Sequence, residues 1–229
     1  MADYVELHAR SSFSFLRGAS IPEQLVKAAI DQQLPAMALL DRDGVYGAPR
    51  FYQCARENQL RARVGAEITL EDGTVLPLLV ENRTGYQNLC RLITTTKLTP
   101  RLMESGLWVG DPPADPHARK RPCFATWAEV ADHAEGLIAL TGDEEGPIRH
   151  AWRTRGAQAV AGVMGKLRQV FGDDRLYVEI QRRRLRGEER ENAFLVDLAR
   201  ATSVPLLATG GVNYALSEHR ETADVFTCL

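Results

Sequence analysis

Short apolar runs alternate with longer segments of helical periodicity along almost the whole chain. Compact apolar runs that end at turn residues are typical of buried strands, and apolar residues spaced three and four positions apart are typical of helices that cover a sheet. Repeated strand–helix alternation favours a largely parallel sheet. The predicted strands lie near 5–8, 35–40, 64–70, 74–80, 136–141, 176–181 and 204–209, and the predicted helices lie near 20–33, 47–59, 84–97, 146–153, 158–171 and 188–202, with a further helix starting at Thr126.

Local signals predict several of the boundaries. Ser20, Thr84 and Thr126 each stand three residues before a Glu or Gln. In this capping-box pattern a hydroxyl and an acid or amide satisfy the first backbone N–H groups of a helix, so each residue is predicted to begin one. Glu71-Asp-Gly73 lies between two apolar runs and is a hairpin signal, which predicts that the strands near 64–70 and 74–80 are neighbours.

The chain is predicted to be a single α/β domain spanning 1–229. Six or seven strands without a boundary half-way along the sequence favour a barrel closed on itself over two lobes. Residues 105–121 are polar and rich in proline, so this segment is predicted to be an exposed loop. Residues 217–229 resemble a helix cut in mid-course, and we expect them to begin a further segment of a longer protein.

Composition places the chain among soluble globular proteins. Its 229 residues carry a formal charge of −2, with 45% hydrophobic and 25% charged residues, which excludes wholesale disorder. The nearly balanced charge argues against tight, purely electrostatic binding of nucleic acid but allows a local basic patch. The four cysteines form no Cys-x-x-Cys pair, which disfavours a zinc ribbon, and no apolar run has the length of a membrane span. We therefore expect a cytoplasmic protein with no membrane contact.

Polar side chains gather where the predicted strands end, which is where closed parallel barrels carry their functional groups. His8 ends the first strand, Asp41 follows the second, and Glu67 lies in the third. His8-Ala9-Arg10-Ser11 departs from a His-x-His-Ser pattern, which would direct two imidazoles at one metal ion. A guanidinium has donors and no lone pair to give, so Arg10 cannot act as the second ligand.

Seven segments, distributed over nearly the whole chain, carry a family resemblance when they are taken in order. These segments are 6–19, 38–47, 65–67, 84–92, 136–142, 177–181 and 207–214. Together they resemble the PHP (polymerase and histidinol phosphatase) domain, and more narrowly the N-terminal PHP domain of bacterial C-family DNA polymerases, in their error-prone branch. The resemblance implies a distorted (βα)7 barrel, which in metal-binding members holds several divalent cations for phosphoester hydrolysis.

Most of the metal ligands that the resemblance implies are absent. His8 and Glu67 match ligand positions, and Asp41 matches an acid that binds metal or orients the site. Other residues stand at the remaining positions, namely Arg10, Arg17, Arg42, Val75, Arg183, Gly211 and Asn213. So few donors cannot fill several coordination shells, and arginines repel cations. We therefore expect no cofactor, with Zn²⁺ or Mn²⁺ bound only if His8, Asp41 and Glu67 remain a functional site.

Arginines at ligand positions suggest a replacement for the charge of the metal. Buried carboxylates without a counter-charge are costly. We therefore expect Arg10 or Arg42 to form an ion pair with Glu67 or Asp41 at the barrel mouth, with Arg17 adding positive charge in the same space.

The run 182–186 contains four arginines and resembles a phosphate-binding segment. Three acidic residues, Glu188, Glu189 and Glu191, follow at once. This arrangement favours a solvated helix start of mixed charge over a phosphate site.

The resemblance implies a metal-depleted, non-catalytic module of an error-prone DNA polymerase. Its expected partners are the remainder of the polymerase chain and an exonuclease or other replication or repair protein. The full-length polymerase, the parent of this chain, would synthesise DNA in translesion repair. One alternative is a metal-dependent phosphoesterase or 3′–5′ exonuclease with a reduced ligand set. The other is a domain that contacts nucleic-acid phosphates through an arginine-lined mouth formed by Arg10, Arg17 and Arg42.

Overall fold

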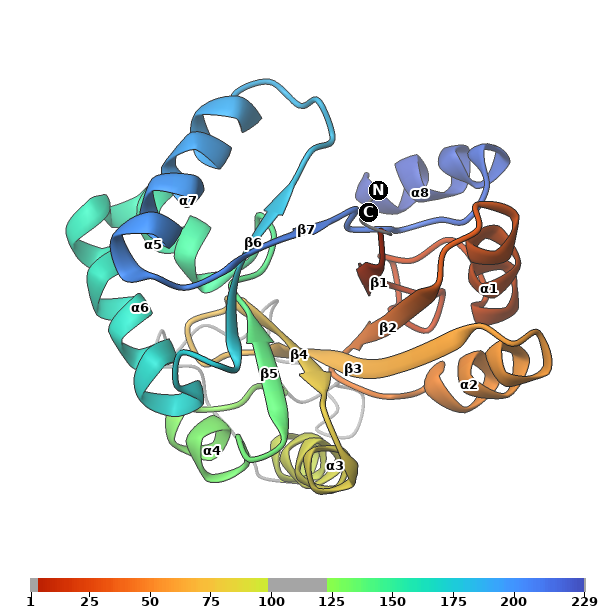
Figure 1. The fold of residues 1–229 in the computed structure, drawn as a ribbon, viewed down its shortest axis with the longest axis horizontal. Helices are drawn as coiled ribbons and strands as arrows, with labels where there is room; N and C mark the ends of the chain where they lie inside the picture. The colour runs from red at the N-terminus through yellow and green to blue at the C-terminus, as the bar shows by residue number, and fades with distance from the viewer. Residues whose placement is uncertain (1–3, 99–122, 229) are drawn as a thin grey trace, which may run out of the picture.

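Seven strands form one sheet in chain order, β1 to β7, in the computed structural model, which describes residues 4–98 and 123–228 (Figure 1). Val212, beyond β7, bridges to Ala9 of β1, so the sheet nearly closes and the predicted barrel is confirmed. The strands are β1 (Glu6–Ala9), β2 (Ala36–Arg42), β3 (Arg61–Thr69), β4 (Val75–Val80), β5 (Leu137–Leu140), β6 (Leu176–Gln181) and β7 (Leu206–Thr209). The helices are α1 (Pro22–Asp31), α2 (Ala48–Glu57), α3 (Arg83–Leu98), α4 (Trp127–Asp132), α5 (Pro147–Arg155), α6 (Ala157–Phe171), α7 (Glu188–Thr202) and α8 (Arg220–Thr227), with a 3₁₀ turn η1 (Ser217–His219).

The sheet is parallel except at β4, which runs antiparallel to both β3 and β5. The cause is the tight turn at Glu71-Asp-Gly73, where Gly73 has a φ of 80° and donates its N–H to the carbonyl of Leu70. A turn this short reverses the chain and leaves no room for a crossover helix. The hairpin is therefore as predicted, and one helix of a regular strand–helix barrel is missing between β3 and β4.

Thr126 begins α4 as the sequence predicts. Its hydroxyl accepts the N–H of Glu129, and the Glu129 carboxylate accepts the N–H of Thr126 at 2.9 Å. The same prediction is wrong for Thr84, which lies inside α3. There Asn82 takes the capping role, because its side-chain oxygen accepts the N–H of Gly85 at 3.0 Å.

The prediction is also wrong for Ser20, since α1 begins two residues later. The N–H of Ile21 donates to the side chain of Gln24 instead. The Ser20 hydroxyl has tertiary partners that the local pattern cannot show. It accepts the N–H of Ala215 at 2.8 Å and lies 2.8 Å from Nδ1 of His219, which ties the segment after β1 to the segment after β7.

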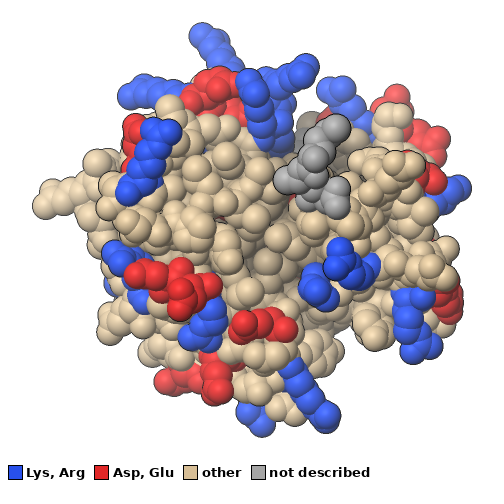
Figure 2. All heavy atoms as spheres, in the orientation of Figure 1, with Lys and Arg blue, Asp and Glu red and all other residues tan. Residues whose placement is uncertain are grey.

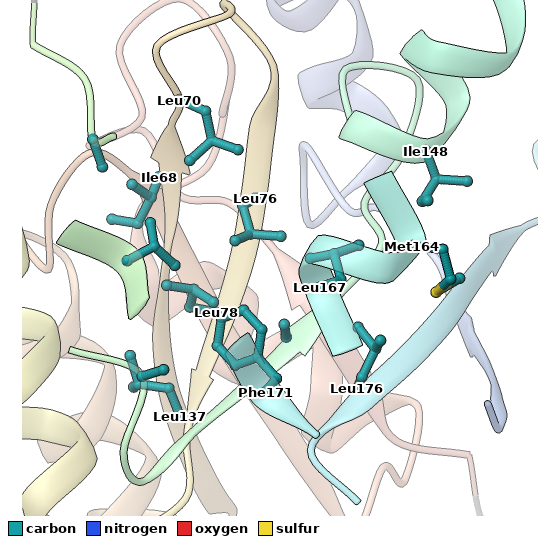
Figure 3. Packing of buried hydrophobic residues seen from close by; sticks show 14 of the residues in the cluster. Ile68, Leu70, Leu76, Leu78, Leu137, Ile148, Met164, Leu167, Phe171 and Leu176 are labelled. Carbon is teal, nitrogen blue, oxygen red and sulfur yellow. The ribbon is translucent and has the colours of Figure 1, made fainter. Parts of the chain in front are cut away.

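Apolar side chains fill the space between the outer face of the sheet and the helices. The largest cluster packs α3 to α7 against β3 to β6 and includes Leu78, Leu137 and Phe171 (Figure 3). A second cluster joins α1 and α2 to β1 and β2 around Leu39 and Phe51. Both clusters follow from strands whose alternate residues face the covering helices.

The interior of the barrel is apolar at one end and charged at the other. Alternate strand residues face inward, and along these inward rows apolar residues come first and polar residues stand near the C-terminal end of the strand. Along β2 this row is Ala38, Leu40 and Arg42, and along β6 it begins at Tyr177 and continues to Glu179. The apolar layer consists of Leu7, Ala38, Leu40, Leu79, Ile138, Leu140, Tyr177 and Leu207. The charged layer lies above it at the C-terminal ends of the parallel strands.

Segment 105–121 lies within 99–122, outside the described residues. The division into one domain over 1–229, with 217–229 opening a further segment, stays a prediction. Over the described ranges, no helix combines the length and apolar character required to cross a membrane.

We predict that Leu78→Ala lowers the free energy of unfolding by about 3 kcal/mol or more, because Leu78 is fully buried between β4 and the helices. Urea unfolding followed by circular dichroism measures the change. The matched control is Leu98→Ala, whose side chain is 74% exposed and whose loss is expected to stay within about 0.5 kcal/mol. Equal losses for the two variants would contradict the packing described.

Candidate functional site

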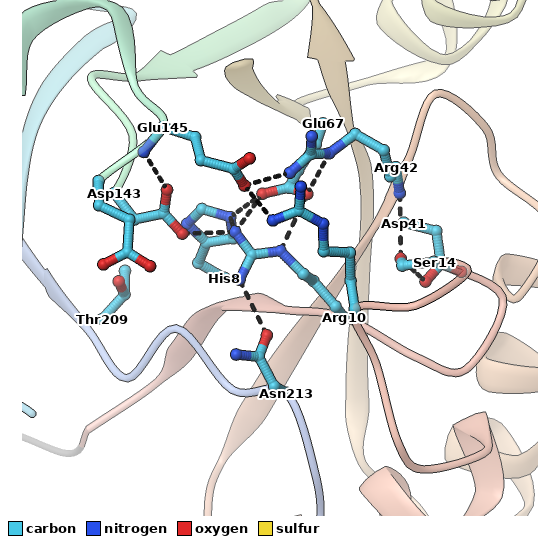
Figure 4. Close-up of polar contacts among 12 residues, drawn as sticks. His8, Arg10, Ser14, Asp41, Arg42, Glu67, Asp143, Glu145, Thr209 and Asn213 are labelled. Atoms are coloured by element: carbon cyan, nitrogen blue, oxygen red, sulfur yellow. Dashed lines mark hydrogen bonds and ion pairs between the residues drawn. The ribbon is translucent and has the colours of Figure 1, made fainter. Parts of the chain in front are cut away.

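The ends of β1, β2, β3 and β6 bring a set of charged side chains together in the barrel mouth (Figure 4). The register explains part of this meeting. Arg42 of β2 stands directly opposite Glu67 of β3, and paired residues on neighbouring strands share a face of the sheet. Both side chains therefore point into the barrel.

Glu67 is the centre of this cluster and has no exposed surface. Its Oε2 accepts hydrogen bonds from Nε of Arg10 at 2.9 Å and from Nε of Arg42 at 3.0 Å. Its Oε1 accepts Nη2 of Arg10 at 2.5 Å and lies 2.8 Å from Nε2 of His8. Burial alone would raise the pKa of Glu67, but the charges of both arginines and the hydrogen bond from His8 hold that pKa well below its usual range.

His8 lies fully buried between two carboxylates. Its Nδ1 is 2.7 Å from Oε1 of Glu179, and its Nε2 is 2.8 Å from Oε1 of Glu67. Burial lowers the pKa of His8, but the charge of Glu179 and the hydrogen bonds to both acids outweigh it and raise the pKa to about 10. His8 is therefore an imidazolium at neutral pH and donates from both ring nitrogens.

Arg10 lies between Glu67 and a third buried acid, Asp143. The same Nη2 that donates to Glu67 also donates to Oδ2 of Asp143 at 2.5 Å, and Nη1 donates to Oδ1 of Asn213 at 3.0 Å. Burial raises the pKa of Asp143, but the charge of Arg10, the charge of His8 and the hydrogen bond from Arg10 together outweigh it and lower that pKa. Arg10 is therefore held by three residues, and its side chain is 4% exposed.

Within this network the charges balance one for one. The cations His8, Arg10 and Arg42 face the carboxylates Glu67, Asp143 and Glu179. Burying any one of these groups alone would cost several kcal/mol, on the order of the desolvation penalty of an ion. The network offsets that cost because each charge has an opposite charge within hydrogen-bonding distance.

Arg17 and Arg42 connect the buried network to the surface. Both donate to Oε2 of Glu145, Arg42 from Nη2 at 2.7 Å and Arg17 from Nη1 at 2.9 Å. The side chain of Arg42 is 17% exposed and that of Arg17 is 48% exposed, so solvent screens the ion pair of Arg17 more strongly. Arg17 therefore lies at the rim of the mouth.

Asp41 does not join this cluster. It neighbours Arg42 in β2, and successive residues of a strand face opposite sides, so Asp41 points away from the interior. Its oxygens accept the hydroxyls of Ser11 and Ser14 and the N–H groups of Ser11 and Gly47 at 2.8–3.1 Å. Asp41 therefore organises the turn after β1 and the start of α2.

The remaining predicted positions lie around the network. Val75 is buried in β4, two residues from Pro77, which pairs with Glu67. Gly211 has a φ of 61° and packs against Gln181. Asn213 accepts a hydrogen bond from Nη1 of Arg10. Arg183 donates from Nη2 to Oε2 of Glu144 at 2.6 Å and lines the outer mouth.

The sequence prediction omitted Asp143 and Glu179. Asp143 follows β5 at its C-terminal end, and Glu179 stands on the inward row of β6, so strand-end position and alternation could have identified both. Glu179 also accepts the Thr209 hydroxyl and Nε2 of Gln181. Its Oε2 is buried and has no partner among the described residues.

Among the described residues, His8, Glu67 and Asp143 form a group whose donor atoms lie within 4.8 Å of one another. This spacing suits a metal ion, but the space is used differently. Nη2 of Arg10 bonds to both carboxylates, and both ring nitrogens of His8 face acids at hydrogen-bonding distance. A divalent ion would have to displace a guanidinium and a proton, so the arrangement fits an ion-pair network better than a metal ion.

A cavity of about 510 Å³ opens above the network. Its wall includes Phe15, Arg17, Glu144, Arg183 and Phe226. Every arginine that lines it has a carboxylate partner, so the mouth offers no surplus positive charge to an anion.

We predict that the free energy of unfolding falls as pH rises from about 6.5 to about 10, because the pKa of His8 is about 10 in the fold and about 6.5 in the unfolded chain. The stabilisation from His8 is complete below its pKa in the unfolded chain. It is lost as pH rises through its pKa in the fold, at up to about 1.4 kcal/mol per pH unit. Urea unfolding at a series of pH values measures the slope.

His8→Gln is the control for this pH dependence, since it removes the titration and keeps an amide of similar reach. It is expected to be less stable than the wild type at pH 6 and to have a flatter profile above that pH. A wild-type profile no steeper than that of His8→Gln would show that His8 is not charged in the fold.

Comparison with known proteins supports the family predicted from the sequence segments. The PHP domain model matches residues 6–183. An error-prone DNA polymerase of Symbiobacterium thermophilum is 36% identical over 228 residues, covering 99% of this chain and 21% of that protein. DNA polymerase III subunit alpha of Caulobacter vibrioides is 29% identical over 237 residues, covering 99% of this chain and 19% of that protein. The chain thus spans about a fifth of the length of these relatives.

Solved structures share the fold at low sequence identity. A protein described as a metal-dependent phosphoesterase from Bifidobacterium adolescentis superposes with a TM-score of 0.59 at 15% identity, covering 99% of this chain and 97% of that one. An amidohydrolase from Chromobacterium violaceum superposes with a TM-score of 0.62 at 12% identity, covering 92% and 87%. Sequence family and barrel architecture agree, and the chain belongs to the PHP domain family.

Proposed function

We propose that this chain is a non-catalytic PHP barrel in which an ion-pair network takes the place of bound metal, and that it serves as a structural and docking module of an error-prone DNA polymerase. One observation carries the proposal. Nη2 of Arg10 lies 2.5 Å from both Glu67 and Asp143, in the space between the acids that a metal ion would bridge. A fixed guanidinium supplies there the positive charge that holds the buried acids together.

The expected partner is the remainder of a polymerase chain. The relatives named error-prone DNA polymerase extend far beyond the region that this chain matches, which supports the placement of the barrel within a larger protein. The parent would carry out DNA-directed DNA synthesis in translesion repair in the cytoplasm, and the barrel would offer a docking surface to an exonuclease or repair protein. Polymerase chemistry would reside outside this chain.

A phosphoesterase or 3′–5′ exonuclease with a reduced ligand set is the second candidate. The grouping of His8, Glu67 and Asp143 within 4.8 Å favours it, as does the fold shared with a protein described as a phosphoesterase. The charge of Arg10 inside that group weighs against it, because Coulomb repulsion opposes a divalent cation at this distance. The phosphate-contact alternative through Arg10, Arg17 and Arg42 is the weakest, since each of these arginines is already paired.

We predict that chelator-treated protein binds no Zn²⁺ or Mn²⁺ at Glu67, so that replacing Glu67 does not change the uptake of either ion. Isothermal calorimetry with each ion on the wild type and on Glu67→Gln measures this. The variant controls for adventitious Zn²⁺ at the free cysteines, which it leaves intact. Binding at micromolar or tighter affinity that Glu67→Gln abolishes would favour the phosphoesterase, and a phosphodiester assay would then follow.

We predict that Arg10→Met lowers the free energy of unfolding by about 3–5 kcal/mol, because it leaves buried carboxylates without their counter-charge. Urea unfolding at neutral pH measures the loss. Arg17→Met is the matched control, because Arg17 also forms an ion pair but is half-exposed, and its loss is expected to be below about 1 kcal/mol.

A second variant tests whether charge, rather than packing, explains the loss. Arg10→Met combined with Asp143→Asn removes one excess negative charge and is expected to recover part of the stability. The structural role would be contradicted if Arg10→Met and Arg17→Met were equally stable.

A further inference from the structure

Loop 182–187, between β6 and α7, differs from the barrel mouth in how its charge is balanced. In Figure 2, Lys and Arg side chains project along the upper edge of the molecule, where Figure 1 places this loop. Inside the mouth the arginines are matched by acids, with Arg183 of the loop itself bound to Glu144 at 2.6 Å.

Arg184 and Arg186 are exposed, and no carboxylate among the described residues lies within ion-pair distance of either. Arg182 pairs with Glu189 at 3.0 Å, but both side chains are about three-quarters exposed, so the pair is weak. This loop therefore carries positive charge that its surroundings do not neutralise.

The acids that follow the loop in sequence are used elsewhere. Glu191 binds Arg149 at 2.9 Å and Arg153 at 2.8 Å on α5. Glu188 turns back onto the loop backbone. Of these three acids only Glu189 stays exposed, where it pairs with Arg182, so the mixed charge at this helix start is one exposed acid beside the exposed arginines Arg182, Arg184 and Arg186.

The loop is also held in a fixed shape. The carboxylate of Glu188 is buried and accepts the N–H groups of Arg183 at 2.8 Å and Arg184 at 2.7 Å. Asn192 donates from Nδ2 to the carbonyl of Gln181 at 2.8 Å. Arg184 adopts a left-handed conformation with a φ of 60°, which a non-glycine residue keeps only when its neighbours hold it. The arginines therefore project from a backbone that needs little ordering on binding.

We propose that loop 182–187 binds the phosphodiester backbone of a nucleic-acid strand, with Arg184 and Arg186 as the phosphate contacts. A guanidinium forms two parallel hydrogen bonds to a phosphate, and each contact releases condensed counter-ions from the strand. Leu185, 54% exposed between the two arginines, provides an apolar contact for a sugar or base. The proposal concerns a different surface from the buried network, so it stands or fails independently of the scaffold role.

Salt dependence tests the contact directly. The affinity of the chain for fluorescently labelled single-stranded oligothymidylate is measured by anisotropy from low to physiological salt. Affinity falls with salt, so the slope of log K against log salt is negative, and Arg184→Ala/Arg186→Ala is expected to make it less steep by about 1.4, at about 0.7 for each lost phosphate contact. The matched control is Arg56→Ala/Arg83→Ala, which removes the same charge from exposed positions outside the loop and mouth and is expected to keep the wild-type slope.

Glu188→Gln separates a shaped site from general attraction. This change makes the chain more positive, so attraction by net charge alone would strengthen binding. Glu188→Gln also removes one of the two side-chain oxygens that accept the loop's backbone N–H groups, and this loss loosens the loop. The proposal therefore expects DNA binding to be about two- to threefold weaker. The proposal is overturned by no binding at low salt, by equal slopes for the two double variants, or by tighter binding of Glu188→Gln.

Discussion

The burial of the Glu67 carboxylate at the centre of the barrel is the constraint on which the upper half of the structure depends. An ion without exposed surface costs several kcal/mol, on the order of its desolvation penalty, unless opposite charges surround it. Arginine and imidazolium side chains meet that need, but each then requires its own anchors. The anchors are Glu179 for His8, Asp143 and Asn213 for Arg10, and Glu145 for Arg42. One buried acid thus couples strands β1, β2, β3 and β6 to the segments that follow β5 and β7.

Strand alternation decides which charged residues can take part. Asp41 and Glu67 are both acids that the sequence offers as partners for Arg42, yet Asp41 and Arg42 are neighbours in one strand and cannot face the same side of the sheet. Register places Arg42 opposite Glu67, and Asp41 consequently faces the turn after β1, where hydroxyls and N–H groups satisfy its oxygens without any counter-charge. The two acids are stabilised by different means, Glu67 by cations and Asp41 by neutral donors, because they lie on opposite faces of the sheet.

Sequence patterns predicted the fold further than they predicted the site. Apolar runs and the Glu71-Asp-Gly73 turn depend on local chemistry, and the strands and the hairpin formed where expected. Capping boxes were reliable at Thr126 but not at Ser20, whose hydroxyl binds a segment from the far end of the chain. The ion pair of Glu67 with Arg10 and Arg42 could be predicted, because arginines stand at positions that the family resemblance assigns to metal ligands and a buried acid needs a counter-charge. Asp143 could be found only from its place after the end of β5, and Glu179 only from alternation along β6, because matching of ligand positions to the family named neither.

The identity of the cations determines how the network responds to its surroundings. A guanidinium keeps its charge across the physiological pH range and cannot dissociate, whereas a metal ion depends on its concentration and competes with protons for its ligands. With two arginines in the cluster, His8 is the one cation there that can lose its charge, and its two acid partners move that loss to high pH. The charged layer of the mouth is therefore neutral, and its arginines are already paired with acids. Contacts that need free positive charge consequently have to form on the surface outside it.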